Sequence, residues 1–292
     1  MARFFDSLKR GFDRGGMLQK IIYVNVGVFL ILRLGAVAIM LAGGDPESLW
    51  ISWVELPSSM AALALRPWTP VTYMFAQYDV LHILFNMLWL YWFGRLFLYV
   101  GTPRQLFGLY LLGGLGGAAI YMAALNLLPY FQGMNAVLLG SSASVIAVVT
   151  ATAWRMPDYR IGLLFIGNVA LKWIAAVTVL LSLLNIPGEN AGGNIAHLGG
   201  AFVGMAYGIA MARGRDITRP INMLIDGCVD VWRRLTATKI NRASNAADNR
   251  TAGRSADRVD MDAILDKIKK SGYASLTADE RQRLFDVSRK IK

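Results

Sequence analysis

Long apolar runs separated by short polar stretches dominate the first 215 residues of the chain. We place six of them at about residues 21–41, 80–98, 105–127, 138–154, 172–186 and 195–212. An α-helix rises 1.5 Å per residue and the hydrocarbon core of a bilayer is roughly 30 Å thick, so about 20 apolar residues cross it. The pattern therefore predicts an all-α membrane protein with a six-transmembrane-helix bundle over residues 21–215, in which the fifth helix is short.

The fourth run differs from the others because small and hydroxyl-bearing residues mark its start. Gly140, Ser141, Ser142 and Ser144 stand there, and Arg155 follows its end. From Ser142 to Arg155 a helix is about 20 Å long, so if the arginine marks one membrane surface the helix begins about 10 Å below the other. Irregular backbone at that depth is tolerated only where it is packed in protein or lines a watery cavity. The sequence therefore predicts a wet pocket with a serine at its base.

Two connecting segments are predicted to lie in the membrane interface rather than in bulk solvent. The long loop at 43–79 is rich in tryptophan, which is typical of the boundary between lipid headgroups and acyl chains. Residues 158–170 are predicted to form a short interfacial segment, with Lys172 and Trp173 anchoring the start of the fifth helix near the surface.

Charged residues lie mostly outside the apolar runs, and their sign alternates from loop to loop. One set of loops carries Arg95, Arg104, Arg155, Arg160, Arg213, Arg215 and Arg219. The opposite set carries Asp45, Glu47, Glu55, Asp79 and Glu189, with Arg66 as the exception. By the positive-inside rule both termini are cytoplasmic, and the Ser142 end of the fourth helix opens to the outside.

Composition narrows the possible functions. The chain is 55% hydrophobic, which is not typical of a soluble domain, and Cys228 is its only cysteine, which excludes disulfides and thiolate metal clusters. The net charge of +11 is attributed to topology and to attraction for anionic membrane lipids rather than to nucleic-acid binding. Residues 1–20 form a cytosolic basic segment without the features of a cleavable signal peptide.

The character of the chain changes after the sixth run. Residues 216–258 are predicted to form an amphipathic segment followed by a flexible linker. Residues 259–292 read as two short helices, with Gly272 as the C-terminal cap of the first and Thr277 and Glu280 as a capping box for the second. We therefore expect a small cytosolic helical hairpin at the C-terminus.

Unusual polar residues of three separate runs fall at nearly the same predicted depth. His82, Ser142 and His197 lie 13, 13 and 16 positions before the arginine at the cytosolic end of each run, which is Arg95, Arg155 or Arg213. The chain has no histidines other than His82 and His197. The helical rise converts these spacings to about 20, 20 and 24 Å. Asn86 lies one turn from His82 on the same face. A lone serine or histidine in a membrane helix more often serves packing, but four polar residues at one level favour a site.

Small residues recur every four positions on the fourth and sixth runs, at Ala143, Ala147 and Ala151 and at Gly200, Gly204 and Gly208. Such ridges let two helix backbones approach closely, which could bring Ser142 within hydrogen-bond reach of His197. The same ridges would also hold a helix bundle together, so packing and a contact between Ser142 and His197 are compatible interpretations.

Over about residues 18–213 the chain resembles the rhomboid intramembrane serine proteases. Gly140-Ser141-Ser142-Ala143 is similar to the GxSG motif of that family, and Ala196-His197-Leu198-Gly199-Gly200 to its AHxGG motif. His82 and Asn86 match its HxxxN motif. The sequence departs from the family at Ala143, which replaces the second glycine, and at Gln77, where many members have histidine. It also departs at Ile146, a position that is often aromatic and stacks on the catalytic histidine.

The resemblance implies a serine endopeptidase that cleaves transmembrane protein substrates near the outer face of a bacterial inner (plasma) membrane. Ser142 is then the nucleophile and His197 the general base. The oxyanion hole is formed by His82, Asn86 and the Ser142 backbone N–H. No metal or organic cofactor is implied. The alternative is a catalytically silent rhomboid-like protein that binds transmembrane clients. A channel or transporter is disfavoured because no run carries the acidic residues that an ion path usually needs.

Overall fold

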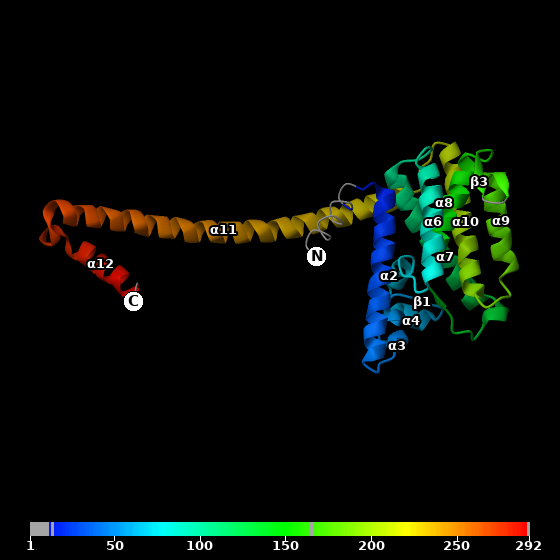
Figure 1. The fold of residues 1–292 in the computed structure, drawn as a ribbon, viewed down its shortest axis with the longest axis horizontal. Helices are drawn as coiled ribbons and strands as arrows, with labels where there is room; N and C mark the ends of the chain where they lie inside the picture. The colour runs from blue at the N-terminus through cyan, green and yellow to red at the C-terminus, as the bar shows by residue number, and fades with distance from the viewer. Residues whose placement is uncertain (1–11, 13–14, 164–165, 291–292) are drawn as a thin grey trace. The chain divides into compact units, whose positions relative to one another are not determined.

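The apolar runs of the sequence fold into helices that lie alongside one another (Figure 1). The computed structural model describes residues 12, 15–163 and 166–290, and most of the predicted basic segment 1–20 lies outside them. The helices of the apolar runs are α2 (Met17–Leu41), α6 (Val80–Phe97), α7 (Pro103–Leu127), α8 (Ser142–Arg155), α9 (Leu171–Leu184) and α10 (Ala191–Ala212). The chain divides into one unit that ends at Leu224 and a second unit over Ile225–Lys292.

Four of these helices are long and apolar enough to cross a membrane. They are α2, α6, α7 and α10, with 25, 18, 25 and 22 residues. Helices α8 and α9 have only 14 residues each, about 21 Å at the helical rise. The shortness of the fifth helix and the start of the fourth at Ser142 agree with the sequence analysis, while the count of six spans stays a prediction.

Helix α8 forms the centre of the first unit. Every residue from 143 to 153 is buried, and the helix packs against α6, α7, α9 and α10. A Cβ atom added to Gly200 would collide with the Ala143 backbone, and one added to Gly204 would collide with that of Ala147. The predicted close approach of the two small-residue ridges is therefore confirmed. Any larger residue would push α10 away from α8.

The segment between α2 and α6 folds into short elements instead of an open loop. These are α3 (Pro46–Leu49), η1 (Ile51–Trp53), β1 (Leu56–Pro57), α4 (Met60–Leu65) and α5 (Thr69–Thr72). The Trp68 indole N–H donates to the Trp53 carbonyl at 2.8 Å, and the two rings stack. Strand β1 pairs antiparallel with β2 (Val137–Leu138), which follows η2 (Pro129–Phe131) and directly precedes the turn into α8. This pairing ties the segment to the N-terminal end of α8.

At the opposite end of the bundle from α3 and α4 lies a two-stranded hairpin (Figure 1). Strand β3 (Arg160–Leu163) pairs antiparallel with β4 (Gly167–Ala170), so the interfacial segment expected here is a β-hairpin. Lys172, at the start of α9, forms an ion pair with Asp158 at 2.6 Å. The hairpin bridges the chain from the end of α8 to the start of α9.

The second unit differs from the sequence analysis in one respect. Helix α11 (Arg219–Ser271) continues through the region where we predicted a flexible linker within 216–258. The predicted linker, residues 236–258, contains no proline and is rich in alanine and arginine, which have high helix propensity, so no proline ends the helix there. The linker was predicted from the low hydrophobicity of these residues, and their helix propensity was given too little weight.

Helix α11 ends at Gly272, whose φ is 78°, a conformation that favours glycine. After η3 (Tyr273–Ser275), the Thr277 amide donates to the Glu280 carboxylate at 2.7 Å and the Glu280 amide donates to the Thr277 hydroxyl at 3.3 Å. This capping box opens α12 (Ala278–Lys290), and Lys267 of α11 forms an ion pair with Glu280 at 2.8 Å. The role of residues 259–292 as a separate cytosolic hairpin stays a prediction.

A buried carboxyl in the segment between α2 and α6 makes stability depend on pH. Glu55 is 5% exposed, and burial raises its pKa from 4.5 to about 7, with Glu47 adding to the rise. Between those values the folded chain binds more protons than the unfolded chain, so stability falls as pH rises. In detergent micelles we expect the thermal unfolding midpoint to drop by a few degrees from pH 5 to pH 8. Glu55→Gln should flatten this dependence, and an equal drop in the variant would contradict the assignment.

Candidate active site

The N-terminal end of α8 meets the first half of α10 at a serine–histidine pair. The Nε2 atom of His197 lies 2.8 Å from the Oγ atom of Ser142, which is a hydrogen-bond distance. Both residues are half-buried. Ser142 is the first residue of α8, and His197 lies three positions before Gly200, where the two backbones are closest. Close packing of two small-residue ridges therefore delivers a hydroxyl to an imidazole.

A strained turn before α8 sets where Ser142 points. Gly140 has φ 123°, a conformation that L side chains rarely adopt, and its amide donates to the Tyr73 carbonyl at 3.0 Å. A Cβ atom on Gly140 would lie 2.7 Å from the Cε1 atom of His82. Glycine is therefore required both for the backbone conformation and for the approach of the histidine ring. This contact places His82 beside the turn that leads into Ser142.

Helix α6 supplies the remaining two residues of the predicted site. Its N-terminus is capped by Asp79, which accepts from the His82 amide at 2.8 Å. One turn on, Asn86 is buried and its side-chain amide donates to the Gln77 Oε1 at 2.7 Å. An amide NH₂ carries two hydrogens, so one N–H of Asn86 is left for another acceptor. Within the described residues no hydrogen bond joins Asn86 to Ser142, and its oxyanion role stays a prediction.

A buried polar network behind Asn86 was missed by the sequence analysis. The Gln77 Nε2 donates to the Asn25 Oδ1 at 3.2 Å, and the Asn25 Nδ2 donates to the Tyr110 hydroxyl at 3.1 Å. The Tyr110 hydroxyl in turn donates to the Met74 carbonyl at 2.6 Å. Glutamine at 77 thus accepts from Asn86 and links it to α2 and α7. An amide within the first apolar run was the signal that could have found Asn25.

A second hydroxyl contacts the other ring nitrogen of His197. The Oγ atom of Ser182, on α9, lies 3.2 Å from the Nδ1 atom of His197, and Ser182 is buried. Ser182 was not predicted to belong to the site, because a serine in a short apolar helix usually bonds only to its own backbone. The imidazole is therefore held between Ser142 on α8 and Ser182 on α9.

A cavity of about 590 Å³ opens beside the imidazole. Its lining is mainly apolar and comes from α6, α8, α9, α10 and the β3–β4 hairpin, and it includes Trp89, Trp92, Ile146, Trp173, Ser182 and His197. An apolar cavity with a few polar groups at one place is typical of a site that binds an apolar ligand segment and acts on it at those groups.

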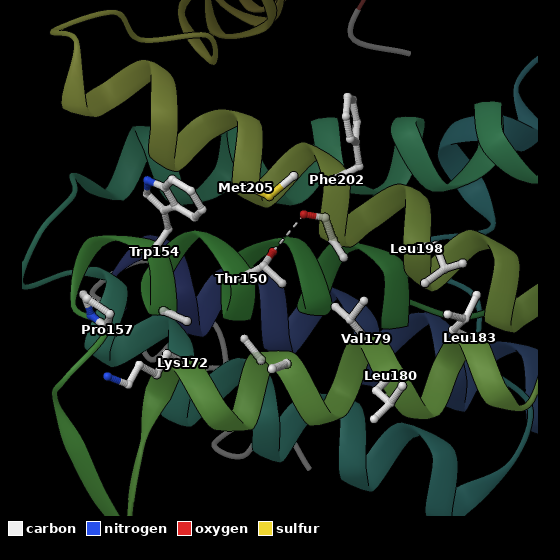
Figure 2. Close-up of a pocket in the computed structure, with 14 residues that line it drawn as sticks. Thr150, Trp154, Pro157, Lys172, Val179, Leu180, Leu183, Leu198, Phe202 and Met205 are labelled. Carbon is white, nitrogen blue, oxygen red and sulfur yellow. Dashed lines mark hydrogen bonds between the residues drawn. The ribbon is translucent and has the colours of Figure 1, made fainter.

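A larger cavity of about 920 Å³ lies between α8, α9 and α10, and neither Ser142 nor His197 is among its lining residues (Figure 2). Its two principal polar side chains are already engaged. The Thr150 hydroxyl bonds to backbone carbonyls, including that of Ala201 at 3.3 Å, and Lys172 pairs with Asp158. Apolar side chains such as Val179, Leu198 and Phe202 complete the wall. This cavity therefore has the chemistry of a space for hydrocarbon rather than of a reaction site.

Two parts of the chain match known protein families. Residues 64–214 match the Rhomboid domain, and residues 249–290 match a family of unknown function (DUF6576). The chain is 29% identical over 216 residues to RHOMBOID-like protein 12, mitochondrial, of Arabidopsis thaliana. It is 28% identical over 91 residues to Rhomboid protease GlpG of Klebsiella pneumoniae.

These alignments cover only part of each relative. The first covers 70% of this chain and 60% of the Arabidopsis protein, and the second covers 31% of this chain and 28% of GlpG. The domain match, by contrast, spans just over half of the chain and contains His82, Ser142 and His197. Together with the helical fold and its four apolar helices, it shows that the chain belongs to the rhomboid family.

Proposed function

We propose that this rhomboid-family protein is an intramembrane serine endopeptidase. The observation that carries the proposal is the 2.8 Å contact between the Ser142 hydroxyl and His197 Nε2 at the end of a buried helix. The imidazole takes the hydroxyl proton as the serine oxygen attacks a peptide carbonyl carbon. The imidazolium then donates that proton to the departing amine, which leaves an acyl-enzyme. Water, deprotonated by the same nitrogen, hydrolyses the ester and restores the serine.

The substrates that fit this geometry are transmembrane segments of other proteins. The cavity beside His197 is apolar and is lined partly by exposed tryptophans such as Trp92 and Trp173. A chain segment from the bilayer could enter such a cavity without exposing apolar side chains to water. Water for deacylation must reach the same place, so the Ser142 end of α8 is expected to face outward.

The competing proposal is a catalytically silent protein that binds transmembrane clients. Binding of a client requires only the apolar cavity and does not require an imidazole aligned on a serine hydroxyl. The contact between His197 and Ser142 therefore favours an enzyme over a silent binder. An activated serine attacks the phosphorus of a fluorophosphonate probe and displaces fluoride. Such a probe should therefore label the purified wild-type protein in detergent and leave Ser142→Ala unlabelled. An unlabelled wild-type protein that still binds a transmembrane peptide would support the silent binder instead.

We place the protein in the inner (plasma) membrane of a bacterium with both termini cytoplasmic. The support is the alternation of arginine-rich and acidic loops along the chain. Membrane lipids are its expected surroundings, and the apolar cavity between α8, α9 and α10 has the chemistry to accept an acyl chain (Figure 2). The net charge of +11 then serves topology and lipid contact, with no role in nucleic-acid binding.

Removing the C-terminal unit should leave an active membrane core. The site lies wholly within the unit that ends at Leu224. We expect a chain truncated after residue 235 and fused there to a topology reporter to cleave substrate at nearly the wild-type rate, with the reporter in the cytoplasm. An external reporter would contradict the topology. A stable but inactive truncation would instead make the residues matched to the family of unknown function part of the catalytic unit.

A further inference from the structure

We propose that Ser182 is a positioning residue that holds His197 in the tautomer required of a general base. This inference rests on the proposed function and extends it to a residue of α9. Three hydrogen-bond distances carry it. His197 Nε2 lies 2.8 Å from Ser142 Oγ, His197 Nδ1 lies 3.2 Å from Ser182 Oγ, and Ser182 Oγ lies 2.9 Å from the Thr178 carbonyl oxygen.

The direction of these hydrogen bonds follows from counting hydrogens. A carbonyl oxygen only accepts, so the single hydroxyl hydrogen of Ser182 goes to Thr178. The Ser182 oxygen must then accept from His197, which requires the hydrogen of the neutral imidazole to sit on Nδ1. Nε2 is left with a free lone pair, and it faces the Ser142 hydroxyl. This is the tautomer that can take the serine proton.

The same contact continues to act as the reaction proceeds. When Nε2 receives the proton from Ser142, the ring becomes positively charged while Nδ1–H still points at Ser182. A hydrogen bond from a charged donor is stronger than one from a neutral donor. The Ser182 oxygen therefore stabilises the imidazolium more than the neutral ring, although it carries no charge itself.

Neighbouring side chains explain why a hydroxyl is needed at this place. Ile146 borders the same cavity as His197 and cannot offer an aromatic face to the ring. Within the described residues the imidazole nitrogens have hydrogen bonds only to Ser142 and Ser182. Because Ser182 is buried and its hydroxyl is fixed by its own helix, its oxygen presents a stationary acceptor.

The test compares three variants in full-length protein. Ser182→Ala should lower kcat for a transmembrane substrate roughly 10- to 100-fold, the range expected when one hydrogen bond to a charged group is lost, with KM nearly unchanged. Ser182→Thr keeps a hydroxyl that can bond to the same carbonyl and should restore most activity. Ser144→Ala is the matched control, because that hydroxyl is buried and has no hydrogen-bond partner among the described residues.

A spectroscopic measurement separates positioning from mere packing. The chain contains only two histidines, so ¹⁵N-histidine labelling gives two rings, and a His82→Ala variant assigns them. When the imidazole is neutral, His197 of the wild-type protein should carry its hydrogen on Nδ1, and Ser182→Ala should lose that preference. A wild-type hydrogen on Nε2 would overturn the proposal even if Ser182→Ala failed to fold.

The outcomes also distinguish this inference from the proposed function. If Ser182→Ala matches Ser144→Ala in kcat and in tautomer while Ser142→Ala is inactive, Ser182 has no positioning role and the protease remains. If Ser142→Ala retains wild-type cleavage, the proposed function fails first, and the tautomer of His197 then has no catalytic meaning.

Discussion

Replacing Ser142 with alanine should abolish cleavage of a reporter transmembrane substrate. The variant loses the only hydroxyl in contact with His197 Nε2, and no other described hydroxyl lies within hydrogen-bond distance of that atom. Loss of a serine nucleophile lowers kcat on the order of 10⁶-fold in a well-studied serine protease. A loss of that size would reduce cleavage by the variant to the uncatalysed background rate. His197→Ala should come close to this loss, because the remaining hydroxyl has no base to take its proton.

Two neighbouring serines provide matched controls for this experiment. Ser141 directly precedes Ser142 and Ser144 lies two residues after it. Both hydroxyls are buried, and within the described residues neither bonds to His197. Ser141→Ala and Ser144→Ala should keep most of the activity, since each removes a hydroxyl without disturbing the contact with His197. Cleavage by Ser142→Ala at the wild-type rate would exclude the serine-protease assignment. Equal losses in all three variants would point to damage to the fold instead.

The predictable parts of the fold are those determined by the order and spacing of residue types along the chain. Apolar runs ended by arginines set the helix ends, because a charged side chain marks where the hydrocarbon stops. The start of α8 at Ser142 followed from the small residues before it, and its contact with α10 from alanines and glycines at every fourth position. These patterns are local or periodic, so they can be recognised without knowing which helices pack against one another.

The parts that were missed depend on neighbours that the pattern does not reveal. In the sequence Ser182 cannot be distinguished from any other serine in an apolar helix. Its contact with His197 exists only because α9 packs against α10. Gln77 was read as a departure from the family, whereas in the fold it accepts from Asn86 and donates to Asn25. Both roles arise from packing between helices distant in sequence. A single sequence carries no record of such pairings.

The network at Gln77 also bears on how rigid the predicted oxyanion hole is. One Asn86 N–H is bound to Gln77, which fixes the plane of the amide and leaves the second N–H with a set direction. Donors that are already oriented cost no reorganisation when negative charge develops on the substrate oxygen. The tie through Asn25 and Tyr110 to the Met74 carbonyl extends this rigidity into the bundle.

Losing Asn86 should therefore impair turnover much more than binding. We expect Asn86→Ala to lower kcat roughly 100-fold, as for other oxyanion donors, because its N–H acts on charge that exists only in the transition state. KM should barely change, since ground-state contacts with the substrate are retained. Labelling of Ser142 by a fluorophosphonate probe should slow as well, because the phosphonyl oxygen would use the same donors.

His82→Ala tests the second donor, and the two variants together separate an oxyanion hole from a binding surface. The His82 ring lies against Gly140, two residues before Ser142, so its removal should slow probe labelling and turnover while leaving peptide binding intact. Thermal unfolding of each variant controls for packing, since a truncated ring beside Gly140 leaves a void. If both variants lose affinity for a transmembrane peptide but turn over bound substrate at the wild-type rate, these residues recognise the client, and the oxyanion must be stabilised by backbone N–H groups at the start of α8.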